Sequence, residues 1–349
     1  MIKTAVVPAR AFVEAAERQI LPVVVRLHRR IREQVIAAFR DPRAGELAGV
    51  AGDEGGDTIY GIDRVSERVL VEELGRDADA LGGIVLVAEG LPGGVTVLPH
   101  GRERASARYA VIVDPIDGTR GLMYQKRSAW VLTGVAPNSA APRLADIVLA
   151  VQTELPTAKQ YLADELWAAR GRGFEARRVD LLRGESAELT LRPSGADGIE
   201  HGFAMLSRFF PGARDAIAAV DEEVVRAVLG PPPAGRALCF EDQYLSSAGQ
   251  FYELIAGHDR FNADLRPLFT RVLAERGEAP PLACHPYDVC TALIAEEAGV
   301  ELSGPRGEPL DAPLDVDTPV AWCGYANARI RARVEPALRA ALERRGLLA

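Results

Sequence analysis

Apolar residues recur every three or four positions between residues 11 and 40. The stripe consists of Val13, Ala16, Ile20, Val24, Leu27, Ile31 and Val35. This spacing places a row of apolar side chains on one face of a helix, with polar side chains on the other faces. We therefore predict one long helix or two abutting amphipathic helices over this segment, packed on a sheet.

Short apolar runs bounded by turn residues follow this helical segment. They predict strands at 84–88, 109–113, 129–136, 146–152 and 160–168. A helix is predicted at about 326–346, near the end of the chain. Strands that alternate with helices form sheets covered by helices, so we predict an α/β (α+β) fold.

Glycine and proline residues interrupt the pattern near 180–195. We expect two subdomains to meet there, an N-terminal α+β subdomain over 1–185 and a C-terminal α/β subdomain over 186–349. The first would carry most of the candidate metal ligands described below. The second would carry Asp288 and the contacts to the substrate.

The composition excludes several classes of protein. The chain has 349 residues, 48% of them hydrophobic, and a net charge of −8, which argues against a partner that is a nucleic-acid polymer. Its four cysteines show no Cys-x-x-Cys spacing, so we expect reduced thiols and neither a zinc ribbon nor a disulfide framework. No uninterrupted apolar stretch approaches the roughly 20 residues of a membrane helix, and we expect a cytoplasmic protein.

The most informative segment is Asp114-Pro115-Ile116-Asp117-Gly118-Thr119, which follows the apolar run at 109–113. Pro115 fixes one backbone angle, and Gly118 supplies the freedom that a sharp turn needs. Such a turn can aim Asp114 and Asp117 at one point, where they would raise each other's pKa unless a cation lies between them. Mg²⁺ is a hard divalent ion that suits such carboxylates. By itself the pattern also fits an Asx-type turn that closes a loop.

Three more acidic residues stand at the borders of predicted elements. Asp63 lies on the polar face of a predicted helix, Glu89 follows the strand at 84–88, and Asp288 lies in the first turn of an apolar helix that starts after Pro286. Each has an ordinary alternative role, as part of a solvated helix face, as a loop residue or as a helix cap.

The segment from Asp114 to Thr119 resembles the signature of the Mg²⁺-dependent, lithium-sensitive phosphatases. This superfamily includes inositol monophosphatase, fructose-1,6-bisphosphatase and the 3′-phosphonucleotide phosphatases. Other elements of the superfamily follow in the expected order between about Asp57 and about Ala326. The resemblance implies the five-layer α-β-α-β-α sandwich of these sugar phosphatases, hydrolysis of a small phosphate monoester, and a homodimer or larger homo-oligomer.

The resemblance also implies residue roles. Two or three Mg²⁺ ions would be held by Glu89, Asp114, the carbonyl of Ile116, Asp117 and Asp288. Asp63 would pair with the hydroxyl of Thr119 to orient the attacking water, and Glu89 would assist in this step. The phosphate ester would contact Asp117, Gly118, Thr119 and Asp288. Ser246 or Ser247 would begin a helix that leads to the second half of the substrate site, although either could simply be an N-cap.

Some positions depart from the pattern of the superfamily. Ala88 and Gly90 stand where the superfamily has a Gly and a second Glu, so no role for that second acid can be carried over. Tyr287 replaces a Trp, and Pro281 replaces the Glu that contacts the ring in inositol monophosphatases. The altered element around Glu89 leaves open a sensor that binds metal and phosphate with little turnover.

The substrate is therefore predicted only as a class. A phosphate of a small polyol or sugar, similar to an inositol phosphate, ranks first, and fructose 1,6-bisphosphate or a 3′-phosphonucleotide ranks behind it. Lys126, Arg127 and Arg208 are candidate contacts for a second phosphate, with solvated surface positions as the alternative.

Overall fold

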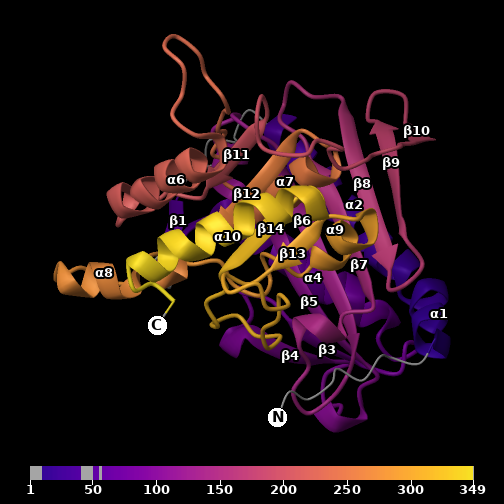
Figure 1. The fold of residues 1–349 in the computed structure, drawn as a ribbon. Helices are drawn as coiled ribbons and strands as arrows, with labels where there is room; N and C mark the ends of the chain where they lie inside the picture. Colours follow the sequence, from indigo (N-terminus) through magenta and orange to yellow (C-terminus); the bar gives the residue numbers. More distant parts are fainter. Residues whose placement is uncertain (1–9, 41–49, 55–56, 349) are drawn as a thin grey trace.

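The computed structural model describes residues 10–40, 50–54 and 57–348 (Figure 1). For the described residues between 40 and 67 it describes the backbone only. This part of the chain contains an eight-stranded sheet, a four-stranded sheet and a two-stranded hairpin. In the described ranges, no helix combines the length and the apolar character that a membrane span requires.

The eight-stranded sheet has the order β10-β9-β8-β7-β6-β5-β3-β4. Its strands are β3 (Ile84–Val87), β4 (Val95–Leu98), β5 (Tyr109–Asp117), β6 (Ala129–Pro137), β7 (Leu149–Leu155), β8 (Leu162–Ala169), β9 (Phe174–Asp180) and β10 (Glu185–Glu188). All neighbours are antiparallel except β3 and β5, which run parallel. The core strands are apolar on both faces because helices cover both sides of the sheet.

The smaller sheets use strands from both ends of the described chain. The four-stranded sheet has the order β11-β12-β14-β13, and β1 pairs with β2 as a separate hairpin. Their strands are β1 (Val50–Glu54), β2 (Asp57–Tyr60), β11 (Phe203–Leu206), β12 (Asp259–Asp264), β13 (Glu301–Ser303) and β14 (Trp322–Tyr325).

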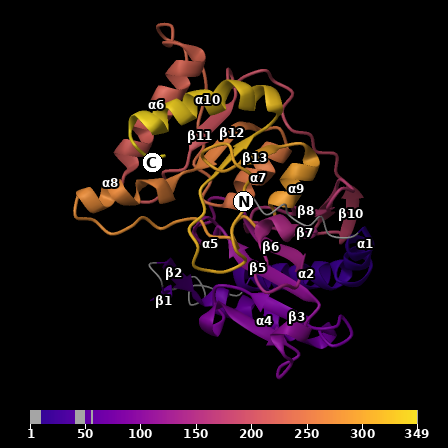
Figure 2. The ribbon, with the colours of Figure 1, turned by 60° about the horizontal axis from the view of Figure 1, so that its bottom comes forward.

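Helices form three layers around the two large sheets. The helices are α1 (Arg10–Gln19), α2 (Leu21–Arg40), α4 (Gly61–Asp77), α5 (Thr119–Met123), α6 (Arg214–Leu229), α7 (Ser247–Ile255), α8 (Thr270–Glu275), α9 (Ala292–Ala298) and α10 (Ala328–Arg344). In Figure 2, α4 lies at the bottom and α6 and α10 lie at the top, with the eight-stranded sheet, then α7 and α9, then the four-stranded sheet between them. Helix α2 packs against α4 and against β6 and β7 of the eight-stranded sheet. The contacts of α7 and α9 with strands of both sheets agree with this order, so the predicted five-layer sandwich is confirmed.

The apolar pattern of the sequence predicted most of the helices and strands in the first half of the chain. The helical stripe forms α1 and α2, which abut at Ile20. The predicted strands at 84–88, 109–113, 129–136 and 160–168 overlap β3, β5, β6 and β8. The strand predicted at 146–152 is displaced, because a 3₁₀ turn at Leu144–Asp146 delays the start of β7 to Leu149. The C-terminal helix is confirmed as α10.

Each face of the eight-stranded sheet packs on its own hydrophobic core. One core lies under α1, α2 and α4, and the other fills the space between the sheets. His28 of α2 is fully buried in the first core, where its ring nitrogens lie 3.0 Å from Thr153 Oγ1 and 2.8 Å from Thr133 Oγ1. Burial lowers the pKa of His28 to about 3, so this histidine stays neutral and joins helix to sheet.

Candidate metal and phosphate site

The candidate site begins at the carboxyl ends of the parallel strands β3 and β5. Val87 pairs with Ile112 at this end of the ladder, so Glu89, two residues after β3, and Asp114 on β5 come out at the same edge of the sheet. Ligands of open sheets bind outside the carboxyl ends of parallel strands. Both residues line one cavity of about 390 Å³.

An irregularity in β5 brings its two aspartates to the same side. Asp114 pairs with Leu132 of β6 and Asp117 pairs with Trp130, so three steps along β5 match two steps along β6. In a regular strand, residues three apart point to opposite faces. The extra residue is a β-bulge, which re-aims a side chain. The two aspartates therefore belong to the bulged end of β5, not to a turn after the strand as the sequence suggested.

The turn itself follows Asp117. Gly118 has φ of +94°, a left-handed conformation that disfavours any residue with a Cβ. A Cβ at this position would lie 3.1 Å from Cβ of Ser246 and 3.2 Å from the carbonyl oxygen of Leu245. The predicted need for glycine is confirmed, and it allows α5 to begin at Thr119 directly against the start of α7.

Asp117 is held by the N-terminus of α7. Its Oδ2 accepts hydrogen bonds from Ser246 Oγ and from the backbone N–H of Ala248, both at 2.8 Å. Ser246 is also the N-cap of α7, because its Oγ accepts the N–H of Gly249 at 2.8 Å. A carboxylate offers about four acceptor positions, so these bonds orient Asp117 and leave it able to contact a cation.

Asp288 reaches the site from a series of turns before α9. Its N–H donates to the carbonyl of His285 at 3.1 Å, and its Oδ2 accepts the N–H of His285 at 2.6 Å. The N–H of Ala292 likewise bonds the carbonyl of Val289, three residues back. The α-helix therefore starts only at Ala292, and the prediction that Asp288 occupies its first turn is wrong.

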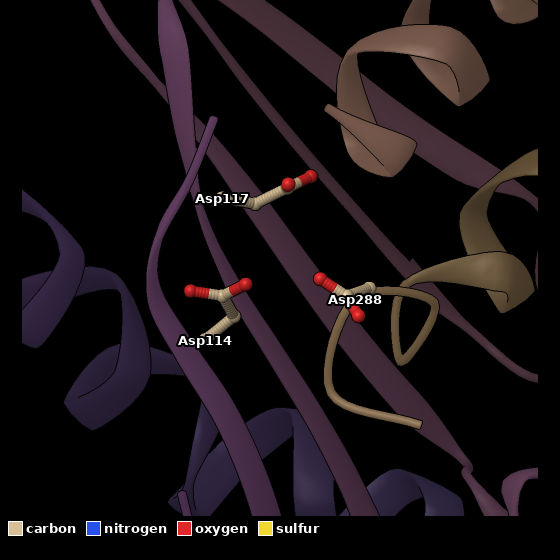
Figure 3. Close-up of side chains that lie close together, drawn as sticks. All are labelled: Asp114, Asp117 and Asp288. Atoms are coloured by element: carbon tan, nitrogen blue, oxygen red, sulfur yellow. The ribbon is translucent and has the colours of Figure 1, made fainter. Parts of the chain in front are cut away.

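The carboxylates of Asp114, Asp117 and Asp288 converge (Figure 3). One oxygen of each lies within 4.8 Å of the others, which is an arrangement that could hold a metal ion. Burial and the charges of Asp117, Asp288 and Glu89 raise the pKa of Asp114 well above its usual range. Burial, partly offset by the bonds from Ala248 and Ser246, raises the pKa of Asp117 to about 6, and burial together with Asp117 also raises the pKa of Asp288.

These raised pKa values indicate which kind of ligand the cluster suits. Carboxylates that are buried side by side disfavour their charged forms unless a cation compensates. A divalent ion with oxygen ligands, such as Mg²⁺ with its preference for carboxylates, phosphate and water, fits this donor set. No nitrogen or sulfur donor belongs to the converging group of described residues, which disfavours a zinc site.

Thr119 and Ile116 lie beside the cluster. The Thr119 hydroxyl donates to the carbonyl oxygen of Ile116 at 2.8 Å, so the predicted metal-ligating carbonyl already accepts one bond. Asp63 lies in α4, but its side chain is outside the described part of the structure. The pairing of Asp63 with Thr119 therefore stays a prediction.

Asp317 and Arg266 line the cavity and were not anticipated from the sequence. Asp317 adds a carboxylate from the segment before β14, and Arg266 adds a buried guanidinium from the segment after β12. Arg266 donates through Nε to Asp264 at 2.9 Å and through Nη1 to the carbonyl of Leu282 at 2.7 Å. Its positive charge partly offsets the rise that burial causes in the pKa of Asp117 and Asp288. Arg266 therefore favours the ionised form of these carboxyl groups. A lone arginine in an Asp-Leu-Arg segment gives no periodic signal that would have identified it.

The basic residues predicted to contact a second phosphate lie elsewhere. Arg127 pairs with Asp242 and with Glu253, and Arg208 pairs with Asp221 and Glu241. Neither they nor the exposed Lys126 lines the cavity that contains the aspartates. The second guanidinium of that cavity belongs instead to Arg120.

Known structures resemble this chain over nearly its whole length. The holo fructose-1,6-bisphosphatase of Leishmania major matches with a TM-score of 0.67 at 14% identity, over 97% of this chain and 99% of that one. The IMPase of Thermotoga maritima matches with a TM-score of 0.59 at 16% identity, over 93% and 98%. SaIMPase-II with inositol monophosphate bound matches with a TM-score of 0.59 at 12% identity, over 94% and 96%.

The chain has the inositol monophosphatase and fructose-1,6-bisphosphatase fold. No family model matches the sequence, and none of the curated proteins matches it. The sugar-phosphatase fold is thus shared at an identity too low to transfer a substrate. The chemistry has to be argued from the site itself.

Proposed function

We propose that this protein is a Mg²⁺-dependent phosphoric monoester hydrolase. The observation that carries the proposal is the convergence of Asp114, Asp117 and Asp288 within 4.8 Å, at the strand ends of a sugar-phosphatase fold. Glu89 lines the same cavity and acts on the pKa of Asp114 and Asp288, which supports its inclusion among the ligands. With the Ile116 carbonyl, these residues would hold two or three Mg²⁺ ions.

Bound Mg²⁺ would supply Lewis-acid stabilisation of the phosphoryl oxygens in an in-line displacement. The other tasks fall to the chain. Gly118 and Thr119 stand at the start of α5, where backbone N–H groups can donate to phosphate oxygens. The Thr119 hydroxyl donates to the Ile116 carbonyl, and a hydroxyl oxygen can also accept a hydrogen bond, so we propose Thr119 as one of the groups that orient the attacking water. Asp63 is proposed as the second group that orients this water.

The proposed substrate class is the phosphate monoester of a small polyol or sugar. SaIMPase-II, which has this fold, binds inositol monophosphate. Fructose 1,6-bisphosphate and a 3′-phosphonucleotide are the alternatives. Binding of the ester through Asp117, Gly118, Thr119 and Asp288, a homodimeric assembly and a cytoplasmic location are proposals that the resemblance supports.

The deciding experiment measures phosphate release from a panel of monoesters and bisphosphates. It is run with Mg²⁺, with EDTA, and with Mg²⁺ plus Li⁺. We expect release from at least one ester that depends on Mg²⁺ and is inhibited by Li⁺. Mg²⁺-dependent binding of these esters without any release would instead support the sensor, and release that persists in EDTA would contradict the proposal.

A further inference from the structure

A second hollow of about 600 Å³ adjoins the candidate site. We call it the annex. Its border with the site cavity is formed by residues that line both hollows, Arg120, Phe209, Phe210, Leu245 and Leu282. Any alcohol group attached to a phosphate at the aspartates could extend across this border, so the annex is the natural place for the distal part of a substrate.

The walls of the annex differ in chemistry from the site cavity. Beyond the border they include Pro211, Leu273, Pro280 and Pro281, and Arg120 and Glu278 are the charged residues among its described lining. Proline lacks a backbone N–H, so this wall offers few donors to a hydroxyl group. Hydroxyl groups placed here would find few hydrogen-bond partners on this wall, whereas an apolar group would gain contact with its apolar residues. The annex therefore disfavours a bare polyol and favours an apolar group.

The border presents an ordered aromatic pair. The rings of Phe209 and Phe210 meet edge to face, with centroids 5.1 Å apart. The Arg266 guanidinium lies 4.7 Å from the Phe209 ring and 5.0 Å from the Phe210 ring, and Arg120 lies 5.2 Å from the Phe210 ring. Cations over aromatic faces hold the rings in place. Arg266 is itself fixed by its hydrogen bond to Asp264, so the two phenylalanine rings are preorganised. Contacts to preorganised side chains cost less entropy when a ligand binds.

We propose that the annex binds an apolar or aromatic substituent on the sugar or polyol half of the substrate. The substrate is then a phosphorylated sugar that carries such a group, not a bare polyol phosphate. The inference rests on the proposed function, because it takes the phosphate to lie at Asp114, Asp117 and Asp288.

The test compares matched pairs of phosphate esters by kcat/KM for phosphate release. One pair is phenyl and methyl glucoside 6-phosphate, and the other is adenosine 5′-phosphate and ribose 5-phosphate. We expect the ring-bearing member of at least one pair to be preferred by about 10-fold, as expected for an extra apolar group in a fitted pocket. A preference confined to one pair identifies an aryl glycoside or a nucleoside as the source of the ring.

Variants locate the preference in the annex. Phe210→Ala and Pro281→Glu should each reduce it to about 3-fold or less, because they remove apolar contact or add a charge. Phe240→Ala is the matched control: Phe240 is a 46% exposed phenylalanine that lines neither hollow, and its loss should leave the preference unchanged. Equal loss in all three variants would contradict the assignment.

Calorimetric binding of the same pairs in Mg²⁺ separates the two proposals. Equal kcat/KM within both pairs, with Mg²⁺-dependent release, overturns the annex inference and leaves the hydrolase intact. If no ester is hydrolysed, the hydrolase proposal fails, and the affinities still decide the inference. Tighter binding of the ring-bearing members, lost in Pro281→Glu, supports it, and equal affinities overturn it.

Discussion

The hydroxyl of Ser246 lies 2.8 Å from Oδ2 of Asp117, although the two residues are 129 positions apart in the sequence. Asp117 ends β5 of the larger sheet, and Ser246 caps α7 between the two sheets. One hydroxyl thus donates to an acid of the site while its oxygen accepts the N–H of Gly249. The stability of the helix and the orientation of the acid depend on the same atom.

Ser246→Ala should therefore have two effects. Loss of the cap should lower the free energy of unfolding by about 1 kcal/mol. Loss of the bond to Asp117 should weaken Mg²⁺ binding by about 10-fold, the lower range for residues that orient metal ligands. Chemical denaturation and calorimetric Mg²⁺ titration measure the two quantities. Ser106→Ala, at an exposed serine of a 3₁₀ turn, is the control, and an unchanged Mg²⁺ affinity in Ser246→Ala would contradict the orienting role.

Asp114→Asn should abolish turnover while the fold survives. The Ile116 N–H donates to Asp114 Oδ1 at 2.9 Å. The Oδ1 of an asparagine can still accept this bond, so the local backbone keeps it. The carboxylate charge is lost, and phosphate release should fall by more than about 100-fold. Near-wild-type release from a folded Asp114→Asn protein, as judged by circular dichroism, would rule out Asp114 as a metal ligand.

Mg²⁺ should stabilise the protein more at neutral pH than at acidic pH. An unfolded aspartate has a pKa of about 3.9, whereas the pKa of folded Asp117 is about 6 and those of Asp114 and Asp288 are also raised. Between these values the unfolded state has released protons that the folded state retains, so without metal these groups destabilise the fold as the pH rises. A bound cation should remove this penalty.

Thermal unfolding in EDTA and in Mg²⁺ at several pH values between about 4.5 and 7.5 checks this expectation. The rise in Tm caused by Mg²⁺ should increase across this range. It should also be much smaller in Asp114→Asn, which carries one fewer buried charge. A rise that does not change with pH would separate Mg²⁺ binding from the three aspartates.

Arg266→Met should destabilise the protein strongly. The substitution leaves Asp264, which is 1% exposed, without its cationic partner. Loss of one member of a buried ion pair costs about 3–5 kcal/mol. The double variant Arg266→Met with Asp264→Leu should recover part of this loss in denaturant unfolding, and Arg276→Met at an exposed pair should change little. A double variant less stable than Arg266→Met would contradict this account.

The sequence predicted the parts of the site that are local in the chain. The apolar run before Asp114, together with Pro115 and Gly118, indicates a strand end at which Asp114 and Asp117 point to one place. These residues are neighbours in the sequence, so a local pattern reveals them. The bulge that aligns Asp114 with Asp117 depends on pairing with β6, so no local pattern reveals it. The five layers came from the resemblance, because periodicity alone does not assign helices to faces.

The remaining parts are set by distant contacts. Asp288 could be named from the resemblance, but the start of α9 was misplaced, since Pro286 and the acid also suit a run of tight turns. Arg266 was missed because its contacts to Phe209 and Phe210 cross the fold and leave no pattern in the local sequence. Short strands such as β13 and β14 were missed because three or four residues carry too little pattern.

The wall of the annex at Pro280 and Pro281 belongs to an irregular segment between α8 and the isolated bridge at Cys284. No strand of either large sheet passes through residues 276–283, so substitutions or small insertions there need not disturb a ladder. Selection could thus alter which alcohol is recognised while the aspartates stay in place. In evolutionary terms, this segment is where proteins that share this scaffold can change their substrate specificity while the aspartate cluster is retained.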